Sequence, residues 1–302
     1  MLKEAADGFS MALADSVPGV SGGTVAFILG FYDRFIGSIN QLVFGRKEEK
    51  LHGLKYLLKL GIGWALGMGL AVIALNALFE QHIYFVSSLF VGFIIGALPV
   101  VCIEEADTVR EWKKGFLFLL LGMFLVIGIT VLNTKVPSAS MNLSAFTPGL
   151  AVKLFLIGMV AISAMFLPGI SGSTMLLIFG AYLPVMSALK ELMHFHFASL
   201  PAVLVFALGI LAGAASVVKL IQAGLSRYRT QMIYFILGMM AASLYAIVMG
   251  PTTLDVPKAA LSLSNFDGIA CVIGIALVIG MQAVKMHDGR KHIEMAVKGT
   301  EK

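Results

Sequence analysis

A short helix-breaking motif occurs twice in this chain, 150 residues apart. The first copy reads Ala14-Asp15-Ser16-Val17-Pro18-Gly19-Val20-Ser21-Gly22-Gly23-Thr24, and the second reads Leu167-Pro168-Gly169-Ile170-Ser171-Gly172-Ser173-Thr174. The same spacing relates Ile28, Gly30 and Tyr32 to Ile178, Gly180 and Tyr182. Identities this dense, in one register, indicate a chain built from two related halves.

The sequence around the motifs is too apolar for a soluble domain. Hydrophobic residues make up 59% of the 302 residues, charged residues make up 13%, and the mean hydropathy is +0.92. Soluble domains carry about 25% charged residues. We therefore expect an all-α polytopic membrane protein. Its net charge of +5 follows from where Lys and Arg lie along the chain and indicates no nucleic-acid partner.

Six apolar runs are long enough to cross a bilayer, which takes about 20 residues. They span residues 56–79, 83–102, 115–133, 200–221, 231–250 and 265–284. The two motif-bearing segments, 5–40 and 151–190, are longer and broken in the middle. Each of them either crosses once as a kinked helix or turns back as a re-entrant hairpin.

The positions of the 22 Lys and Arg residues favour re-entrant hairpins. If both broken segments return to the side they entered, most basic residues share one face, which the positive-inside rule makes cytoplasmic. If the second segment crossed, the basic loop at 219–229 and the basic tail would face outward. For the first segment only Lys3 bears on the choice. The shared face holds Lys3, Arg46, Lys47, Lys50, Lys55, Lys59, Arg110, Lys113, Lys114, Lys219, Arg227, Arg229, Lys285, Arg290, Lys291, Lys298 and Lys302.

The two halves then have opposite orientations, which is the inverted-repeat plan of secondary transporters. Residues 1–133 form the first repeat, with a hairpin at 5–40 followed by three transmembrane helices. An extracytoplasmic loop at 134–148 leads into the second repeat, 149–284, with a hairpin at 151–190 and three more helices. A cytoplasmic tail, 285–302, completes the chain, so both termini are predicted to be cytoplasmic.

The repeated motif has the chemistry of an anion site. Pro18-Gly19 and Pro168-Gly169 end one half-helix, and a second can begin just beyond them. The start of that second half-helix presents unpaired N–H groups and the positive end of a dipole. Bare glycine backbone and hydroxyl donors there suit phosphate, although kinks used only for tight packing are the alternative. The candidate ligands are Ser21, Gly22, Gly23 and Thr24 in the first copy and Ser171, Gly172, Ser173 and Thr174 in the second.

Two charged residues near the first motif have open roles. Asp15 lies close to the hairpin tip, where a carboxylate is costly and therefore functional by default. It can carry a proton, bind a coupling cation or cap the second half-helix, and its counterpart in the second copy is Met165. Arg34 follows Thr24 by about 15 Å of helix, near the cytoplasmic headgroups. There it either meets a lipid phosphate or extends to water beside Asp33.

No enzymatic site is predicted. Residues 19–23 fit the pattern G-x-S-x-G, but a nucleophilic serine needs a base, and all six His residues fall in loops or at membrane edges. The second copy breaks the pattern at Ser173. Neither His nor the two cysteines, Cys102 and Cys271, show metal-ligand spacing, so we expect no metal and no cofactor.

The motif, followed by Ile28-Leu-Gly-Phe-Tyr-Asp-Arg34, resembles the signature of the bacterial polyprenyl-phosphate (undecaprenyl-phosphate) transporter family of the PopT type. Leu167-Pro-Gly-Ile-Ser-Gly-Ser173 resembles that family's second signature. The resemblance implies movement of undecaprenyl phosphate from the outer to the inner leaflet of the bacterial cytoplasmic membrane for reuse in peptidoglycan synthesis. An acidic residue would be expected after Tyr182, where this chain has Leu183. The implied site residues are Asp15, Ser16, Pro18, Gly19, Ser21, Gly22, Gly23, Thr24, Arg34, Pro168, Gly169, Ser171, Gly172 and Ser173.

Two other function classes remain open on the residues alone. The same half-helix cradle could serve a secondary transporter of a small soluble anion, which would need a closed aqueous funnel rather than a lateral gap toward lipid. A structural membrane scaffold would tolerate the substitutions Ser21→Ala and Ser171→Ala. The expected partners are polyprenyl phosphate, membrane lipid and a coupling proton or cation, and the oligomeric state is left open.

Overall fold

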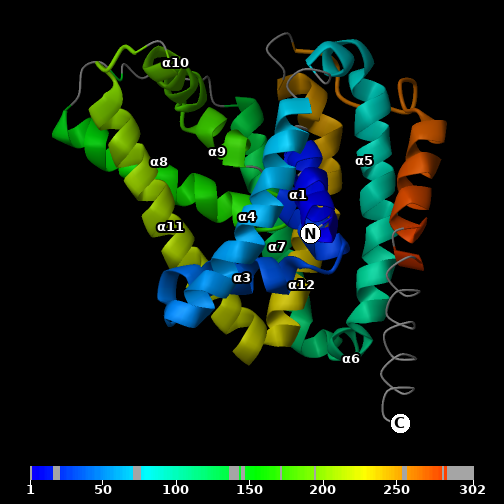
Figure 1. Ribbon diagram of the computed structural model, residues 1–302. Coiled ribbons are helices and arrows are strands. Elements are labelled where there is room, and N and C mark those ends of the chain that lie inside the picture. The colour runs from blue at the N-terminus through cyan, green and yellow to red at the C-terminus, as the bar shows by residue number, and fades with distance from the viewer. Residues whose placement is uncertain are drawn as a thin grey trace.

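The computed structural model describes residues 2–15, 21–70, 76–135, 143, 147–170, 172–193, 195–253, 257–280 and 282–283. Within these ranges every regular element is a helix (Figure 1). The elements are α1 (Leu2–Asp15), α2 (Gly22–Ile28), α3 (Tyr32–Phe44), α4 (Lys47–Leu70), α5 (Asn76–Glu104), α6 (Ala106–Val109), α7 (Trp112–Lys135), α8 (Pro148–Phe166), α9 (Gly172–Ile178), α10 (Tyr182–Met193), α11 (Leu200–Arg227), α12 (Arg229–Met249), a short 3₁₀ helix (Gly250–Thr253) and the helix Gly268–Gly280.

Among the described residues, five helices are long and apolar enough to cross a membrane, and the protein is a multi-pass membrane protein. The spans are 82–104, 112–132, 148–166, 200–227 and 229–252, and four of them match predicted runs. The predicted run at 56–79 is divided instead, because α4 begins at Lys47 and α5 begins at Asn76. The run at 265–284 contains the shorter helix Gly268–Gly280. The unexpected span is α8, which continues without interruption to the Pro168-Gly169 break and runs obliquely toward the centre of the molecule (Figure 1).

Both motif-bearing segments fold as a helix, a break, a seven-residue helix, a turn and another helix. The seven-residue helices α2 and α9 occupy Gly22–Ile28 and Gly172–Ile178, and the helices after them begin at Tyr32 and Tyr182. Each element therefore keeps the spacing of the sequence repeat. The turns contain Gly30 and Gly180, whose φ angles of 71° and 65° lie in the left-handed region that favours glycine.

Glycines allow close contact between α1 and α4 in the first half and between α8 and α11 in the second. A Cβ atom on Gly67 of α4 would lie 2.8 Å from the carbonyl oxygen of Phe9 in α1. In the second half, a Cβ atom on Gly213 of α11 would lie 2.6 Å from the Cα atom of Met159 in α8. The small-residue pairs Gly63/Gly67 and Gly209/Gly213 thus serve helix packing, as their spacing predicts.

The remaining spans pack across the two halves of the sequence. Gly122 of α7 and Gly238 of α12 bring those helices into backbone contact. In the same way, Gly92 of α5 and Gly274 bring α5 against the helix Gly268–Gly280. Helix α12 of the second half therefore contacts α7 of the first, and α5 of the first half contacts the helix Gly268–Gly280 of the second. Helix α12 is the most buried of the spans, with Ile236, Met239 and Met240 fully enclosed.

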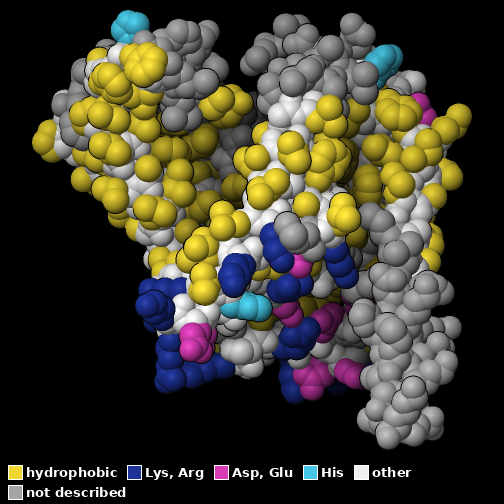
Figure 2. All heavy atoms as spheres, in the orientation of Figure 1, with side chains coloured by type: hydrophobic (Ala, Val, Ile, Leu, Met, Phe, Trp, Pro, Cys, Tyr) yellow, Lys and Arg dark blue, Asp and Glu magenta, His cyan; other side chains and the backbone are white. Residues whose placement is uncertain are grey.

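Charged side chains gather at one end of the molecule, below a broad apolar band (Figure 2). We call this the charged end. It contains the turn between α3 and α4, helix α6 and the start of α12 (Figure 1). Its basic residues are Arg46, Lys47, Lys50, Arg110, Lys113, Lys114, Arg227 and Arg229.

Candidate functional site

The start of α2 and the Pro168-Gly169 break, distant in sequence, meet inside the molecule at what we call the break junction. Three side chains of the first segment bond to the backbone of the second. The Ser21 hydroxyl donates to the carbonyl of Leu167 at 3.3 Å, and the Tyr32 hydroxyl donates to that of Phe166 at 2.9 Å. The Thr24 hydroxyl accepts from the backbone N–H of Gly169 at 2.7 Å. The junction consists of Ser21, Thr24, Tyr32, Phe166, Leu167 and Gly169.

The polar atoms of the junction are shut away from the surroundings. Ser21, Thr24 and Tyr32 have at most 1% of their surface exposed. Buried backbone at a helix break must find partners, because an unsatisfied N–H or C=O group inside a membrane protein is costly. The side chains of the first segment therefore satisfy the backbone that the Pro168-Gly169 break releases. In this conformation the start of α2 and the Pro168-Gly169 break are held together, and the three hydroxyls of the junction are closed to a ligand.

The start of α2 is capped twice. Ser21 is the N-cap residue, and its hydroxyl accepts from the N–H of Gly23 at 3.1 Å. The Asp15 carboxylate accepts from the N–H of Gly22 at 2.7 Å and from the indole N–H of Trp64 at 3.1 Å. Asp15 thus links the end of α1, the start of α2 and the middle of α4. Of the three roles open to it, these contacts are those of a helix cap.

Three glycines around the junction lie so close to neighbouring atoms that a side chain would fit only if those atoms shifted. A Cβ atom on Gly23 would lie 3.0 Å from the carbonyl oxygen of Phe166. Gly169 has a φ angle of 86°, and a Cβ atom there would lie 2.7 Å from the carbonyl oxygen of Met239. A Cβ atom on Gly22 would lie 2.7 Å from the Asp15 carboxylate. These glycines permit contacts that any side chain would displace.

The predicted site residues divide into several groups. Ser21, Gly22, Gly23 and Thr24 lie together at the start of α2, against the Pro168-Gly169 break. Their role as phosphate ligands stays a prediction, since the hydroxyls of Ser21 and Thr24 contact protein groups here. In the second copy Gly172, Ser173 and Thr174 form the first turn of α9, which packs against α8 and α7. Ser16, Pro18, Gly19 and Ser171 lie outside the described residues.

Arg34 lies away from the junction, on α3 near the charged end. Its guanidinium stands 4.4 Å from the ring centre of Tyr56 and 3.7 Å from the Glu4 carboxylate. The side chain is 56% exposed. Arg34 therefore has Glu4 and Tyr56 as neighbours and is still accessible from outside. Whether it binds a lipid phosphate or is solvated by water stays a prediction.

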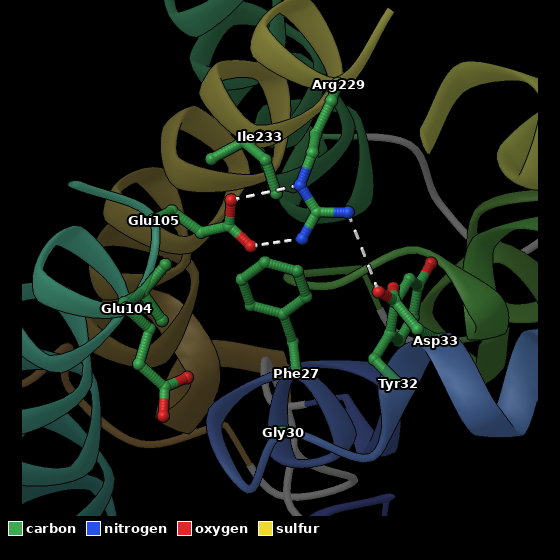
Figure 3. Close-up of a pocket in the computed structure, with 9 residues that line it drawn as sticks. Phe27, Gly30, Tyr32, Asp33, Glu104, Glu105, Arg229 and Ile233 are labelled. Carbon is green, nitrogen blue, oxygen red and sulfur yellow. Dashed lines mark hydrogen bonds and ion pairs between the residues drawn. The ribbon is translucent and has the colours of Figure 1, made fainter. Parts of the chain in front are cut away.

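A cavity of about 280 Å³ lies between the junction and the charged end (Figure 3). Its lining comes from both halves of the chain. Arg229 at the start of α12 forms a bidentate pair with Glu105 and lies 3.8 Å from the Asp33 carboxylate. Phe27 and Tyr32 line the side toward the junction, with their rings in edge contact at 5.6 Å. The other lining residues are Gly30, Val101, Glu104 and Ile233.

Several of these residues were missed or misplaced by sequence reasoning. A tyrosine at the end of an apolar segment is typically an interfacial anchor, but Tyr32 is fully buried and its hydroxyl donates to the opposite segment. Glu105 follows an apolar run, where the sequence predicts a solvated helix end, but its side chain is only 17% exposed and pairs with Arg229. Trp64 carried no motif. Trp64 lies between Gly63 and Gly67, on the face of α4 that meets α1. That position is the signal that could have predicted a contact between its indole N–H and Asp15.

Within the described ranges, no group of three or more His, Cys, Asp or Glu side chains is arranged to hold a metal ion. Cys102 and Cys271 are free thiols on different helices. The polar chemistry at the junction consists of hydroxyls, one carboxylate and backbone groups, and at the cavity it consists of carboxylates and one guanidinium. The hydroxyl, backbone N–H and guanidinium groups can bind an anion through hydrogen bonds and charge, and the carboxylates compete with it for these donors.

Comparison with known proteins assigns this arrangement to a family. Residues 11–264 match the family model described as VCA0040-like, undecaprenyl phosphate translocase-like. The polyprenyl-phosphate transporter of Staphylococcus aureus (strain NCTC 8325 / PS 47) is 38% identical over 248 residues, which cover 82% of this chain and 86% of the relative. The polyprenyl-phosphate transporter of Vibrio cholerae serotype O1 (strain ATCC 39315 / El Tor Inaba N16961) is 32% identical over 260 residues, which cover 82% and 78%. No solved structure matches the chain significantly.

Proposed function

The chain belongs to the undecaprenyl phosphate translocase-like family, and from this premise we propose that it moves a polyprenyl phosphate between the two leaflets of the bacterial cytoplasmic membrane. The transport runs from the outer to the inner leaflet and returns the carrier lipid, undecaprenyl phosphate, for cell-envelope synthesis. The protein acts as a transporter and carries out no covalent chemistry.

The observation that carries this proposal is the break junction. The starts of α2 and α9 belong to matched copies of one motif, and helix starts favour anions through their N–H groups and dipole. At the junction, Ser21 and Thr24 contact backbone groups that a phosphate can replace. When the two segments separate, these hydroxyls and the backbone around Gly22 and Gly23 become free to hold the phosphate.

The two halves are proposed to be inverted repeats whose broken segments are re-entrant hairpins. In support, the last helix of the first segment, α3, lies at the charged end, whereas the last helix of the second, α10, lies at the opposite end (Figure 1). The packing of α7 against α12 and of α5 against the helix Gly268–Gly280 pairs matched helices of the two halves, as a pseudo-two-fold relation requires. By the positive-inside rule the charged end is cytoplasmic, and both termini lie on that side.

Only the phosphate needs a polar path. The prenyl chain stays in the hydrocarbon and passes along a lateral opening, because moving it through water would expose a large apolar area at about 25 cal/mol per Å². The phosphate is then passed from one half-helix start to the other as the two halves move. A cycle of this kind is the alternating access of transporters that bind their substrate between repeats.

The proposal is tested with the full-length protein in vesicles that contain undecaprenyl phosphate. An external phosphatase hydrolyses only the lipid of the outer leaflet, so vesicles without protein should keep an unreacted inner pool. Vesicles with the protein should lose that pool, and the substitution Gly23→Leu should slow the loss by blocking the junction. Persistence of the inner pool in the presence of correctly folded protein would contradict lipid transport.

The same vesicles separate the lipid from a soluble anion. Uptake of radiolabelled inorganic phosphate without loss of the inner lipid pool would assign the site to a small soluble anion instead. In cells that lack the protein, the lipid proposal predicts that carrier-lipid phosphate accumulates in the outer leaflet, where an impermeant label can reach it. Unchanged labelling in those cells would argue against the proposed direction.

A further inference from the structure

We propose that Arg229, Glu105 and Asp33 form an ion-pair gate that closes the transport path at the charged end. This inference rests on the proposed function, since it places the gate on the route between the break junction and the cytoplasmic leaflet. The gate residues come from three places: Asp33 from the first turn of α3, Glu105 from the N-cap position of α6, and Arg229 from the start of α12 (Figure 3).

The geometry of the Arg229–Glu105 pair is that of a specific contact. Both carboxylate oxygens of Glu105 accept from the Arg229 guanidinium, one from Nε at 3.1 Å and the other from Nη2. The third nitrogen, Nη1, faces Asp33 at 3.8 Å. A bidentate fork of this kind fixes orientation as well as charge. All three guanidinium nitrogens of Arg229 are therefore directed at carboxylates.

Partial burial of Glu105 separates this pair from the fully solvated ion pairs at this end. The Glu105 side chain is 17% exposed and that of Arg229 is 47% exposed, whereas Arg110 and Asp107 are exposed by 82% and 102%. Exposed pairs of the second type contribute little to stability. The gate pair also joins the two halves of the chain, since Asp33 and Glu105 belong to the first and Arg229 to the second. A movement of α3 away from the start of α12 would break the contact between Asp33 and Arg229, and a movement of α5 away from α12 would break the pair with Glu105.

The gate lies at one side of the cavity, and the break junction lies behind the other. Phe27 and Tyr32 separate the cavity from the junction, and the Tyr32 hydroxyl bonds to Phe166 within it. A phosphate that leaves the junction toward the charged end would cross Phe27 and Tyr32 and then reach Arg229. In the closed state the carboxylates of Asp33, Glu104 and Glu105 repel that anion, and those of Asp33 and Glu105 occupy the Arg229 guanidinium. Once the halves separate, Arg229 becomes free to receive the phosphate.

The test measures access to the cavity without relying on transport. Val101 lines the cavity and is only 2% exposed, so Val101→Cys reports opening when the native thiols are removed by Cys102→Ala and Cys271→Ala. The purified full-length protein is treated with a charged maleimide. Adding Asp33→Asn and Glu105→Gln should raise the labelling rate about threefold to fivefold, because the loss of a partly exposed ion pair shifts the equilibrium between closed and open states by that order.

A matched control replaces the exposed carboxylate at the same end. Asp107→Asn removes one negative charge from the solvated pair with Arg110 and should leave the labelling rate unchanged. A charge exchange tests the pairing itself, with Asp33→Asn present throughout. Arg229→Glu should open the cavity by placing like charges together, and adding Glu105→Arg should restore slow labelling. Restoration would exclude a general loosening of the fold, because a merely damaged protein gains nothing from a second substitution.

Two results would overturn the gate. One is a labelling rate in the Asp33→Asn, Glu105→Gln protein equal to that of the Asp107→Asn control. The other is failure of the exchanged pair to slow labelling in protein that elutes as a single folded species. Neither depends on the lipid. If the wild-type protein moved no polyprenyl phosphate while the labelling changed as expected, the gate would stand and the proposed function would fail.

Discussion

At the scale of single residues, the same side chains that suit phosphate binding also hold the two segments together. Ser21 caps α2 and donates to Leu167, and Thr24 accepts from Gly169. Each hydroxyl is thus occupied when the junction is closed and available when it opens. In the proposed transport cycle a phosphate competes with these internal partners, which would couple its binding to the separation of the segments.

Thr24→Val should lower the stability of the closed protein. Valine has nearly the same shape but cannot accept from the N–H of Gly169, and a buried unpaired N–H costs about 1–3 kcal/mol. Thermal unfolding in detergent measures the loss. Thr130→Val is the matched control, because the Thr130 hydroxyl donates to Val126 within α7 and its removal leaves no new unpaired donor. Equal melting temperatures for the two variants would contradict the contact.

Asp15→Asn distinguishes a helix cap from a proton carrier. The cap role predicts a loss of about 1–3 kcal/mol, because each carboxylate oxygen accepts from a different N–H, and an amide with one oxygen leaves either Gly22 or Trp64 without its acceptor. Transport should then fall by a similar factor at every pH, so that its pH profile keeps the wild-type shape. A profile that becomes flat in the variant would show instead that Asp15 titrates during the cycle. Ser10→Ala, whose hydroxyl donates within α1, serves as the control for stability.

At the scale of elements, local chemistry predicts where the helices break but not what the breaks contact. Pro168-Gly169 ends α8, and α2 and α9 begin at the matched glycines of the motif, as their residue types indicate. The bonds from Ser21, Thr24 and Tyr32 to residues 166–169 depend on packing between distant segments, which no local pattern encodes. The sequence did not predict that α8 is long enough to span the membrane. The motif marks where α8 ends and carries no information on where it begins or how it tilts.

Two glycines on α4 allow a test of the packing between α1 and α4. Gly63 faces the backbone of Ala5, whereas a Cβ atom on Gly61 would meet nothing within 4 Å. Gly63→Ala should push the helices apart and lower the melting temperature, because overpacking costs about 1–3 kcal/mol. Gly61→Ala should raise it slightly through helix propensity, by up to about 1 kcal/mol. A loss of stability in both variants would indicate that glycine is needed in α4 for some reason other than this contact.

At the scale of the whole molecule, three separate features divide it into two opposed ends. The sequence repeat relates the halves, the charged residues mark one end, and the helices α3 and α10 lie at opposite ends (Figures 1 and 2). Closure at the charged end by the gate leaves the junction cut off from that side. For alternating access, the path toward the other end should open when this one is closed.

The proposed orientation can be measured with single cysteines in a protein that carries Cys102→Ala and Cys271→Ala. Glu48→Cys lies at the exposed start of α4 at the charged end, and Ala198→Cys lies in the exposed turn before α11 at the other. In intact cells an impermeant maleimide should label the second and not the first, because the positive-inside rule places the charged end in the cytoplasm. Permeabilised cells should label both, which controls for reactivity. Labelling of Glu48→Cys in intact cells would reverse the orientation, and the gate would then close the path on the outer side.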